Sequence, residues 1–327
     1  MQLKPIRRLG LIAWVLVVTL GFALPAGAET INYRLKWLYN MSVAGDLYAL
    51  EEGFFADEGL DVDVKAGGPE RDAIKELELG YAKFGVASAD QVIRARAKGA
   101  KVMVLAQLFQ INPLQWIYRP DEVTLNSVAD LKGQTIGVTF GGNDETIMKT
   151  LLALGQIKEK DVELFSVRYD YTPFYQRKVN IWPVYRNSQA IFVEQKLRDA
   201  GEPVGEFNPE EYGVKFVANS VVTHEKVLAE QPEMVKAFMR ALLKGWTQGF
   251  DPANREKTLQ IVKKYDKDTE MAVIAKQYEV TRELVQPDAD VPIGTIDPDG
   301  WLQTERIMVT QGLVDEPVGI GALLKQY

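Results

Sequence analysis

The stretch that decides the fold is Lys36 to Val64, KWLYNMSVAGDLYALEEGFFADEGLDVDV. It completes a run, residues 31–37, in which apolar and polar side chains alternate with the period of a half-buried strand. Apolar residues then recur at helical spacing over 43–54, and a second alternating run follows over 60–64. Strand, polar turn, helix and strand together predict one βαβ unit.

The polar turn of this unit carries three candidate ligand-binding residues, Trp37, Asn40 and Ser42. Ligands of open α/β sheets bind where a strand ends and a helix begins, so this turn is well placed. Ser42 is the expected N-cap of the helix, because its hydroxyl can accept from a free backbone N–H. Trp37 shares the side of the strand that bears the apolar residues, so a core aromatic is the alternative.

The first 28 residues indicate a secretory signal peptide. Three cations precede the almost wholly apolar run Leu9 to Leu24, and the small residues Ala26-Gly27-Ala28 form a cleavage site, so we expect removal after Ala28. A membrane anchor is the alternative, but the run is shorter than the roughly 20 residues that a span requires. The sequence thus predicts an exported, periplasmic protein.

Composition excludes several classes of protein. The chain has 327 residues, no cysteine and a net charge of −7, which argues against nucleic acid and anionic membranes as partners. Without cysteine there is no thiol nucleophile and no lipid attachment site, so we expect a freely soluble monomer. His224 is the single histidine, and it stands at a strand-to-helix junction. We therefore expect no catalytic residues, no metal site and no cofactor.

Strand and helix signals alternate through the first two thirds of the chain, and almost everything after His224 is helical. Strands separated by helices favour parallel pairing in sheets covered on both faces. We expect an α/β protein with two lobes, a hinge, a cleft between the lobes and a helical C-terminal tail. The expected division is lobe 1 over 29–112 plus 218–327, lobe 2 over 117–214, and hinge crossings near 113–117 and 213–218.

Polar and aromatic groups recur at the predicted strand ends. The turn Gly141-Gly142-Asn143-Asp144-Glu145 follows a strand, and its free N–H groups suit an acceptor on a ligand, although an ordinary capped turn explains it equally well. Ser88, Asp90 and Gln110 end strands of the first lobe, whereas Tyr171, Trp182, Tyr185 and Asn187 belong to the second. Core packing is the alternative for Trp182 and Tyr185.

The motifs Trp37-x-x-Asn40, Gly53-Phe54-Phe55 and Glu58-Gly-Leu-Asp-Val62 resemble the start of periplasmic solute-binding proteins. The branch includes binders of thiamine pyrimidine precursors, alkanesulfonates and nitrate. Tyr185 also fits the family pattern, but Asn187-Ser188-Gln189 stands where relatives often have Asn-Glu-Pro. The resemblance implies the two-lobed periplasmic-binding-protein fold, a small-molecule ligand, and delivery to a membrane ABC permease and its ATPase.

The expected cleft offers aromatic faces, amides and acids, and no named position is Arg or Lys. We therefore expect a neutral or cationic heteroaromatic nutrient, such as a pyrimidine precursor of thiamine or a flavin-like ring. An alkanesulfonate, taurine or nitrate-like anion is the alternative ligand, and a ligand sensor or an exported enzyme of the same shape is the alternative function. The predicted ligand-binding set is Trp37, Asn40, Ser42, Ser88, Asp90, Gln110, Asn143, Asp144, Glu145, Tyr171, Trp182, Tyr185 and Asn187.

Overall fold

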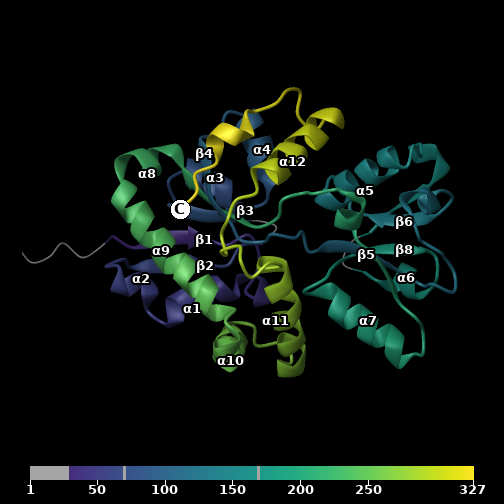
Figure 1. Ribbon diagram of the computed structural model, residues 1–327, viewed down its shortest axis with the longest axis horizontal. Coiled ribbons are helices and arrows are strands. Elements are labelled where there is room, and N and C mark those ends of the chain that lie inside the picture. Colours follow the sequence, from purple (N-terminus) through teal and green to yellow (C-terminus); the bar gives the residue numbers. More distant parts are fainter. Residues whose placement is uncertain (1–28, 69–70, 168–169) are drawn as a thin grey trace, which may run out of the picture.

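A computed structural model of the chain describes residues 29–68, 71–167 and 170–327. Two α/β lobes lie side by side, each built on its own five-stranded sheet (Figure 1). The predicted signal peptide falls outside the described residues. In the part of the chain that the structure describes, none of the helices has the length and apolar character needed to cross a bilayer.

The sheet of lobe 1 has the order β2-β1-β3-β10-β4. Its strands are β1 (Ile31–Arg34), β2 (Val62–Lys65), β3 (Phe84–Ala87), β4 (Val102–Gln107) and β10 (Ser220–His224). β1 runs parallel to β2 and β3, as the opening βαβ unit predicts. β10 returns from the far side of lobe 2 and inserts antiparallel between β3 and β4.

The sheet of lobe 2 has the order β7-β6-β8-β5-β9. Its strands are β5 (Leu114–Tyr118), β6 (Thr135–Val138), β7 (Glu163–Ser166), β8 (Ile181–Tyr185) and β9 (Gly205–Phe207). The expected parallel pairing is confirmed for β6 with β7 and β8 and is wrong for β5, which is antiparallel to both β8 and β9. The antiparallel strands are the ones that enter or leave a lobe, where no crossover helix dictates direction.

The helices surround these sheets. Those of lobe 1 are α1 (Ala44–Glu51), α2 (Phe54–Asp57), α3 (Ala73–Glu78), α4 (Ala89–Ala97), α8 (Glu225–Glu230), α9 (Pro232–Gly249), α10 (Arg255–Tyr265), α11 (Met271–Val285) and α12 (Pro298–Thr310). Those of lobe 2 are α5 (Asn143–Leu154), α6 (Thr172–Tyr175) and α7 (Gln189–Asp199). Short 3-10 turns add η1 (Met41–Val43), η2 (Val128–Leu131), η3 (Glu159–Asp161), η4 (Pro209–Tyr212), η5 (Pro252–Asn254) and η6 (Ile320–Leu323).

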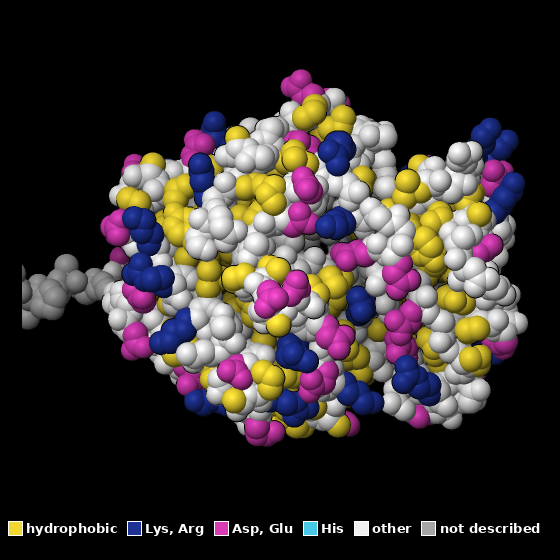
Figure 2. Space-filling view, viewed as in Figure 1, with side chains coloured by type: hydrophobic (Ala, Val, Ile, Leu, Met, Phe, Trp, Pro, Cys, Tyr) yellow, Lys and Arg dark blue, Asp and Glu magenta, His cyan; other side chains and the backbone are white. Residues whose placement is uncertain are grey.

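The C-terminal tail is part of the core of lobe 1. Phe238 of α9 stacks on Phe84 of β3 with ring centroids 3.6 Å apart, and Phe55 of α2 stacks near it at 5.2 Å. The apolar face of α9 thus packs on residues that lie far earlier in the sequence. On the outer face, basic and acidic side chains are interspersed over lobe 1 (Figure 2).

The crossing of α1 over α9, which we call the α1–α9 junction, is very close. A Cβ atom on Gly45 would lie 2.3 Å from the ring of Trp246, and one on Gly245 would lie 2.4 Å from the Cβ of Ala49. Asp46 is fully buried here and accepts a hydrogen bond of 2.6 Å from the hydroxyl of Tyr33. The two helices therefore meet through their glycines, with the ring of Trp246 packed on Gly45.

The two segments that pass between the lobes are tied to each other. Asn112 is 7% exposed, and its Nδ2 donates to the carbonyl of Phe216 at 2.6 Å. Its Oδ1 accepts from the N–H of Leu114 at the start of β5. The side chain of Asn112 therefore links the two segments that cross between the lobes. β10 begins only at Ser220, because the second crossing occupies the residues before it.

Candidate functional site

Trp37 lies outside the core. β1 ends at Arg34, three residues earlier than the alternation predicts, so Trp37 stands on a bend with 38% of its surface exposed. Its carbonyl accepts from the N–H of Gly67 at 2.8 Å. Gly67 is required there because a Cβ would lie 2.1 Å from the carbonyl oxygen of Leu35. The exposed ring contradicts the interpretation of Trp37 as a core aromatic.

Asn40, and not Ser42, caps the turn that follows. The side-chain oxygen of Asn40 accepts from the backbone N–H of Ser42 at 2.8 Å, which makes Asn40 the N-cap of η1. The prediction that Ser42 is the cap is wrong, because an Asx turn forms two residues earlier, at Asn40. The hydroxyl of Ser42 is thereby left to contact the other lobe.

Asn187 joins the two lobes. Its Nδ2 lies 3.0 Å from Ser42 Oγ and 3.1 Å from Thr281 Oγ1, and only 2% of the residue is exposed. Ser42 belongs to η1 and Thr281 to α11, so one amide of lobe 2 donates to two separate elements of lobe 1. We call this trio the Asn187 junction. It brings two predicted site residues, Ser42 and Asn187, into direct contact.

The turn before α5 satisfies its own hydrogen bonds. Asp144 Oδ2 accepts from the N–H of Thr139 at 2.6 Å, and Glu145 accepts from the N–H of Gly141 at 2.7 Å. Gly142 is the N-cap, and burial raises the pKa of Asp144. Both carboxylates therefore face their own loop. The expectation that Asp144 and Glu145 offer themselves to a ligand is corrected, since they occupy the N–H groups predicted to be free.

Asn143 and Tyr185 bring two strand ends of lobe 2 together. Asn143 opens α5, and its Nδ2 lies 3.4 Å from the hydroxyl of Tyr185 at the end of β8. Both side chains are half-buried. This pair offers an amide and a phenol on the side of lobe 2 that also bears Asn187.

Trp182 is a core residue. Its surface is 1% exposed, and its ring centroid lies 5.6 Å from that of Tyr171 and 5.9 Å from that of Phe174. The prediction that Trp182 binds the ligand is wrong. Trp182 lies within β8, not at its end, and its side chain packs in the core of lobe 2. Tyr171 covers it and is half-buried, and burial raises the pKa of Tyr171, so its hydroxyl is neutral.

Ser88 and Gln110 hold lobe 1 together. Ser88 is 3% exposed, caps α4, and donates to Asp90 Oδ1 at 2.5 Å. Gln110 Nε2 donates to the carbonyls of Gln107 and Thr295, at 3.0 and 2.8 Å. The amide donors expected for a ligand at Gln110 are therefore used within the lobe.

Lys36 is a cation beside the predicted site that the sequence interpretation omitted. It directly precedes Trp37 and is half-buried. Burial lowers its pKa, and the charge of Asp90 opposes this. Within residues 29–68, 71–167 and 170–327 its ammonium group forms no ion pair. Its place next to Trp37 is the sequence signal for this cation, whereas strand alternation predicts a side chain that faces solvent.

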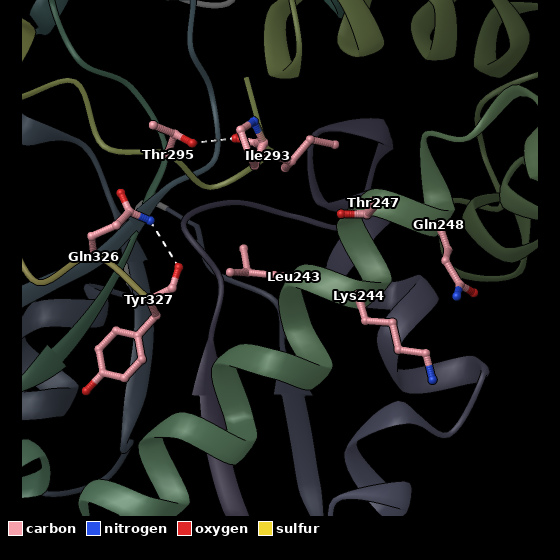
Figure 3. A pocket seen from close by; sticks show the side chains of 9 residues that line it. Leu243, Lys244, Thr247, Gln248, Ile293, Thr295, Gln326 and Tyr327 are labelled. Atoms are coloured by element: carbon pink, nitrogen blue, oxygen red, sulfur yellow. Dashed lines mark hydrogen bonds between the residues drawn. The ribbon is translucent and has the colours of Figure 1, made fainter. Parts of the chain in front are cut away.

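Two cavities lie away from these residues. One, of about 580 Å³, opens between α9 and the last residues of the chain (Figure 3). It is lined by Leu243, Lys244, Thr247, Gln248, Pro292, Ile293, Thr295, Gln326 and Tyr327. The other, of about 270 Å³, lies between α7 and α11 and so spans the lobes. It is lined by Ile191, Phe192, Gln195, Lys196, Asp199, Val273 and Lys276.

The chain is similar to proteins of known kind. A family model described as "NMT1/THI5 like" matches residues 40–254. The riboflavin-binding protein of Chloroflexus aurantiacus is 26% identical over 89% of this chain and 84% of its own length. The formylaminopyrimidine-binding protein of Halalkalibacterium halodurans is 26% identical over 89% and 88%. The periplasmic aliphatic sulphonate binding protein of Escherichia coli shares the fold, with a TM-score of 0.71 at 14% identity over 90% and 91%.

Proposed function

The chain belongs to the NMT1/THI5-like family, and from that premise we propose that it binds a small heteroaromatic nutrient between its lobes and delivers it to an ABC importer. A pyrimidine precursor of thiamine or a flavin-like ring is the ligand class. The observation that carries the proposal is the Asn187 junction. Ser42 of lobe 1 and Asn187 of lobe 2 were each predicted to bind the ligand, and the Asn187 Nδ2 and Ser42 Oγ atoms lie 3.0 Å apart. Two lobes that meet through such residues suit a ligand-dependent closure.

The residues around this junction suit a planar ligand. Trp37, five residues before Ser42, exposes its ring, and aromatic stacking adds about 0.5–1.5 kcal/mol beyond burial. Asn143 and Tyr185 supply an amide and a phenol from lobe 2. Relatives that share about a quarter of the sequence bear the names of flavin and pyrimidine binders, which supports the same ligand class.

An anionic ligand is the second candidate, and Lys36 favours it. A half-buried ammonium group without an ion pair in the described residues would attract a sulfonate or nitrate-like group. Asp90 lies close enough to offset that charge, which favours the neutral heteroaromatic. The two candidate ligands therefore differ in the role of Lys36. It binds an anionic ligand directly, whereas a neutral heteroaromatic does not depend on its charge.

An exported enzyme of this shape is less well supported. His224 caps α8 by accepting from the N–H of Lys226 at 3.0 Å, and its Nε2 lies 3.4 Å from Glu78. It thus has a structural task far from Trp37 in the chain. A binding protein needs no base, and the periplasm, a permease and an ATPase are the setting and partners that this proposal implies.

Calorimetry on the parent protein and Lys36→Met tests both candidates. The probes are riboflavin, formylaminopyrimidine, taurine and an alkanesulfonate. We expect a heteroaromatic to bind and its affinity to change less than about threefold in Lys36→Met. The bound probe should also raise the melting temperature and reduce the radius of gyration. Tight binding of a sulfonate alone, lost in Lys36→Met, would establish the anion instead.

A further inference from the structure

One row of side chains on α11 faces lobe 2. Val273 lines the cavity against α7, and Thr281 accepts from Asn187 at 3.1 Å. Gln277 stands four residues after the first and four before the second, and residues at this spacing share one face of a helix. Gln277 therefore lies on the part of α11 that faces the boundary between the lobes.

The side-chain oxygen of Gln277 is buried beside this boundary without a hydrogen-bond partner in the described residues. The residue is 3% exposed, and its Oε1 is buried with no hydrogen bond to any described residue. A buried acceptor without a donor is unfavourable, whereas the same oxygen on a separated lobe would bond to water. Contact between the lobes therefore raises the free energy of this oxygen.

Other contacts across the boundary act in the opposite direction. Asn187 bonds to Ser42 and Thr281, and Lys276 Nζ donates to Gln195 Oε1 at 2.9 Å. On the other side, the side-chain amide of Gln311 donates to the carbonyl of Thr146 at 2.8 Å. The balance between these bonds and the unpaired oxygen decides how often the lobes close unaided.

We propose that Gln277 disfavours the closed form and keeps the ligand-free protein open, so that it tunes affinity without touching the ligand. This inference rests on the proposed function, since it takes the lobes to open and close around a ligand. Apparent affinity falls with the fraction of protein in the competent form. Removing the unpaired oxygen should therefore increase closure and affinity together, about tenfold.

The test measures the distance between the lobes. Because the chain has no cysteine, two can be introduced at Ala272 of α11 and Ala200 after α7, both exposed, and labelled with a dye pair. In the ligand-free protein, Gln277→Leu should shift the population toward the short distance. Gln277→Glu buries a charge at the same point and should shift it toward the long distance. Riboflavin and formylaminopyrimidine are then titrated into each variant.

Gln115→Leu is the matched control. Gln115 is 2% exposed and its Oε1 is also buried without a partner, but it shares the face of β5 that bears Ile117 in the core of lobe 2. Gln115→Leu should raise the melting temperature and leave the interlobe distance and the affinity unchanged.

The outcomes separate the two proposals. An unchanged distance in Gln277→Leu, an equal shift in Gln115→Leu, or weaker binding in Gln277→Leu overturns the role of Gln277; weaker binding would mean that the amide contacts the ligand. A shifted distance in a protein that binds no probe supports Gln277 as an opponent of closure and rejects the ligand class of the proposed function.

Discussion

Two contacts of lobe 1 differ in kind, the α1–α9 junction and the Asn187 junction. At the first, glycines bring backbones together, with Trp246 fully buried against them. At the second, hydroxyls and one amide meet at 3.0–3.1 Å across the lobes. The first excludes water from closely packed backbone and rings and from the buried carboxyl of Asp46, whereas every group of the second can bond to water if the lobes separate.

This difference indicates which contacts are permanent. Close apolar packing gains its free energy from the exclusion of water and loses it all at once on separation. A neutral hydrogen bond exchanged with water contributes only about 0.5–1.5 kcal/mol net. A hinge protein therefore needs both kinds, one within a lobe and one between lobes, and changes at the two should affect different measurements.

The largest expected effect is a pH dependence at the α1–α9 junction. Burial raises the pKa of Asp46 to about 7, although Tyr33 and Trp246 favour its ionised form. The folded state therefore binds this proton more tightly than the unfolded state, so the stability that protonated Asp46 contributes is full below about pH 4 and is lost as pH rises to about 7. This loss is on the order of 4 kcal/mol at most.

Urea unfolding of the parent protein and of Asp46→Asn at several pH values measures this pH-dependent loss of stability. The difference in unfolding free energy should grow in favour of Asp46→Asn between pH 4 and pH 7. Asp63→Asn, at an exposed position of β2, should run parallel to the parent. Parallel curves for Asp46→Asn would show that the buried carboxyl stays ionised.

The second effect is a steric break of the same junction. In Gly245→Ala the new methyl group meets the backbone oxygen of Gly45 at 2.6 Å as well as Ala49, so the helices must move apart. Overpacking of this kind costs about 3 kcal/mol. Thermal unfolding should show a large fall in the melting temperature with unchanged affinity. Gly249→Ala is the control, since its Cβ would meet Tyr48 at 3.3 Å.

The third effect concerns the exposed ring of Trp37. Trp37→Ala should weaken ligand binding at least tenfold and hardly move the ligand-free melting temperature, because the ring is 38% exposed and outside the core. Calorimetry and thermal unfolding measure the two quantities. Leu38→Ala, the neighbouring residue at 56% exposure, should change neither. A loss of stability without a loss of affinity would remove Trp37 from the site.

The smallest effect concerns the reversible junction itself. Thr281→Val keeps the shape and removes an acceptor of Asn187, so binding should weaken about threefold while the melting temperature stays within a degree or two. Thr258→Val is the mirror case: its hydroxyl donates to the carbonyl of Gly249 inside lobe 1. That variant should unfold earlier and bind as before, and the opposite pattern would reverse our assignment of the two junctions.

Alternation and helical spacing were sufficient to predict the elements around Trp37 and the α/β class. They did not predict where β1 stops, because the strand ends where Gly67 contacts it, and that contact is distant in sequence. The antiparallel entry of β10 was likewise missed, since pairing across a whole lobe leaves no local pattern. β9 left no local pattern either, since its three residues are too few to show a period.

The sequence predicted where the site lies better than it predicted which side chains face it. Strand ends pointed to Ser42 and Asn187, which do meet. Residue type alone could not show that Asp144 and Glu145 turn back onto their own loop, or that Trp182 faces inward. Gln277 carried no sequence signal, because a glutamine on a helix is ordinarily at the surface.

The place of β10 in its sheet has a consequence for the order in which the lobes form during synthesis. The strands of lobe 2 are all present once residue 207 has been added, so that lobe can acquire its core early. The sheet of lobe 1 lacks the strand between β3 and β4 until residue 224 emerges, and its aromatic stack waits for Phe238. The first lobe to be started is therefore the last to be finished, and its unpaired strand edges are the part of the nascent chain most in need of a chaperone.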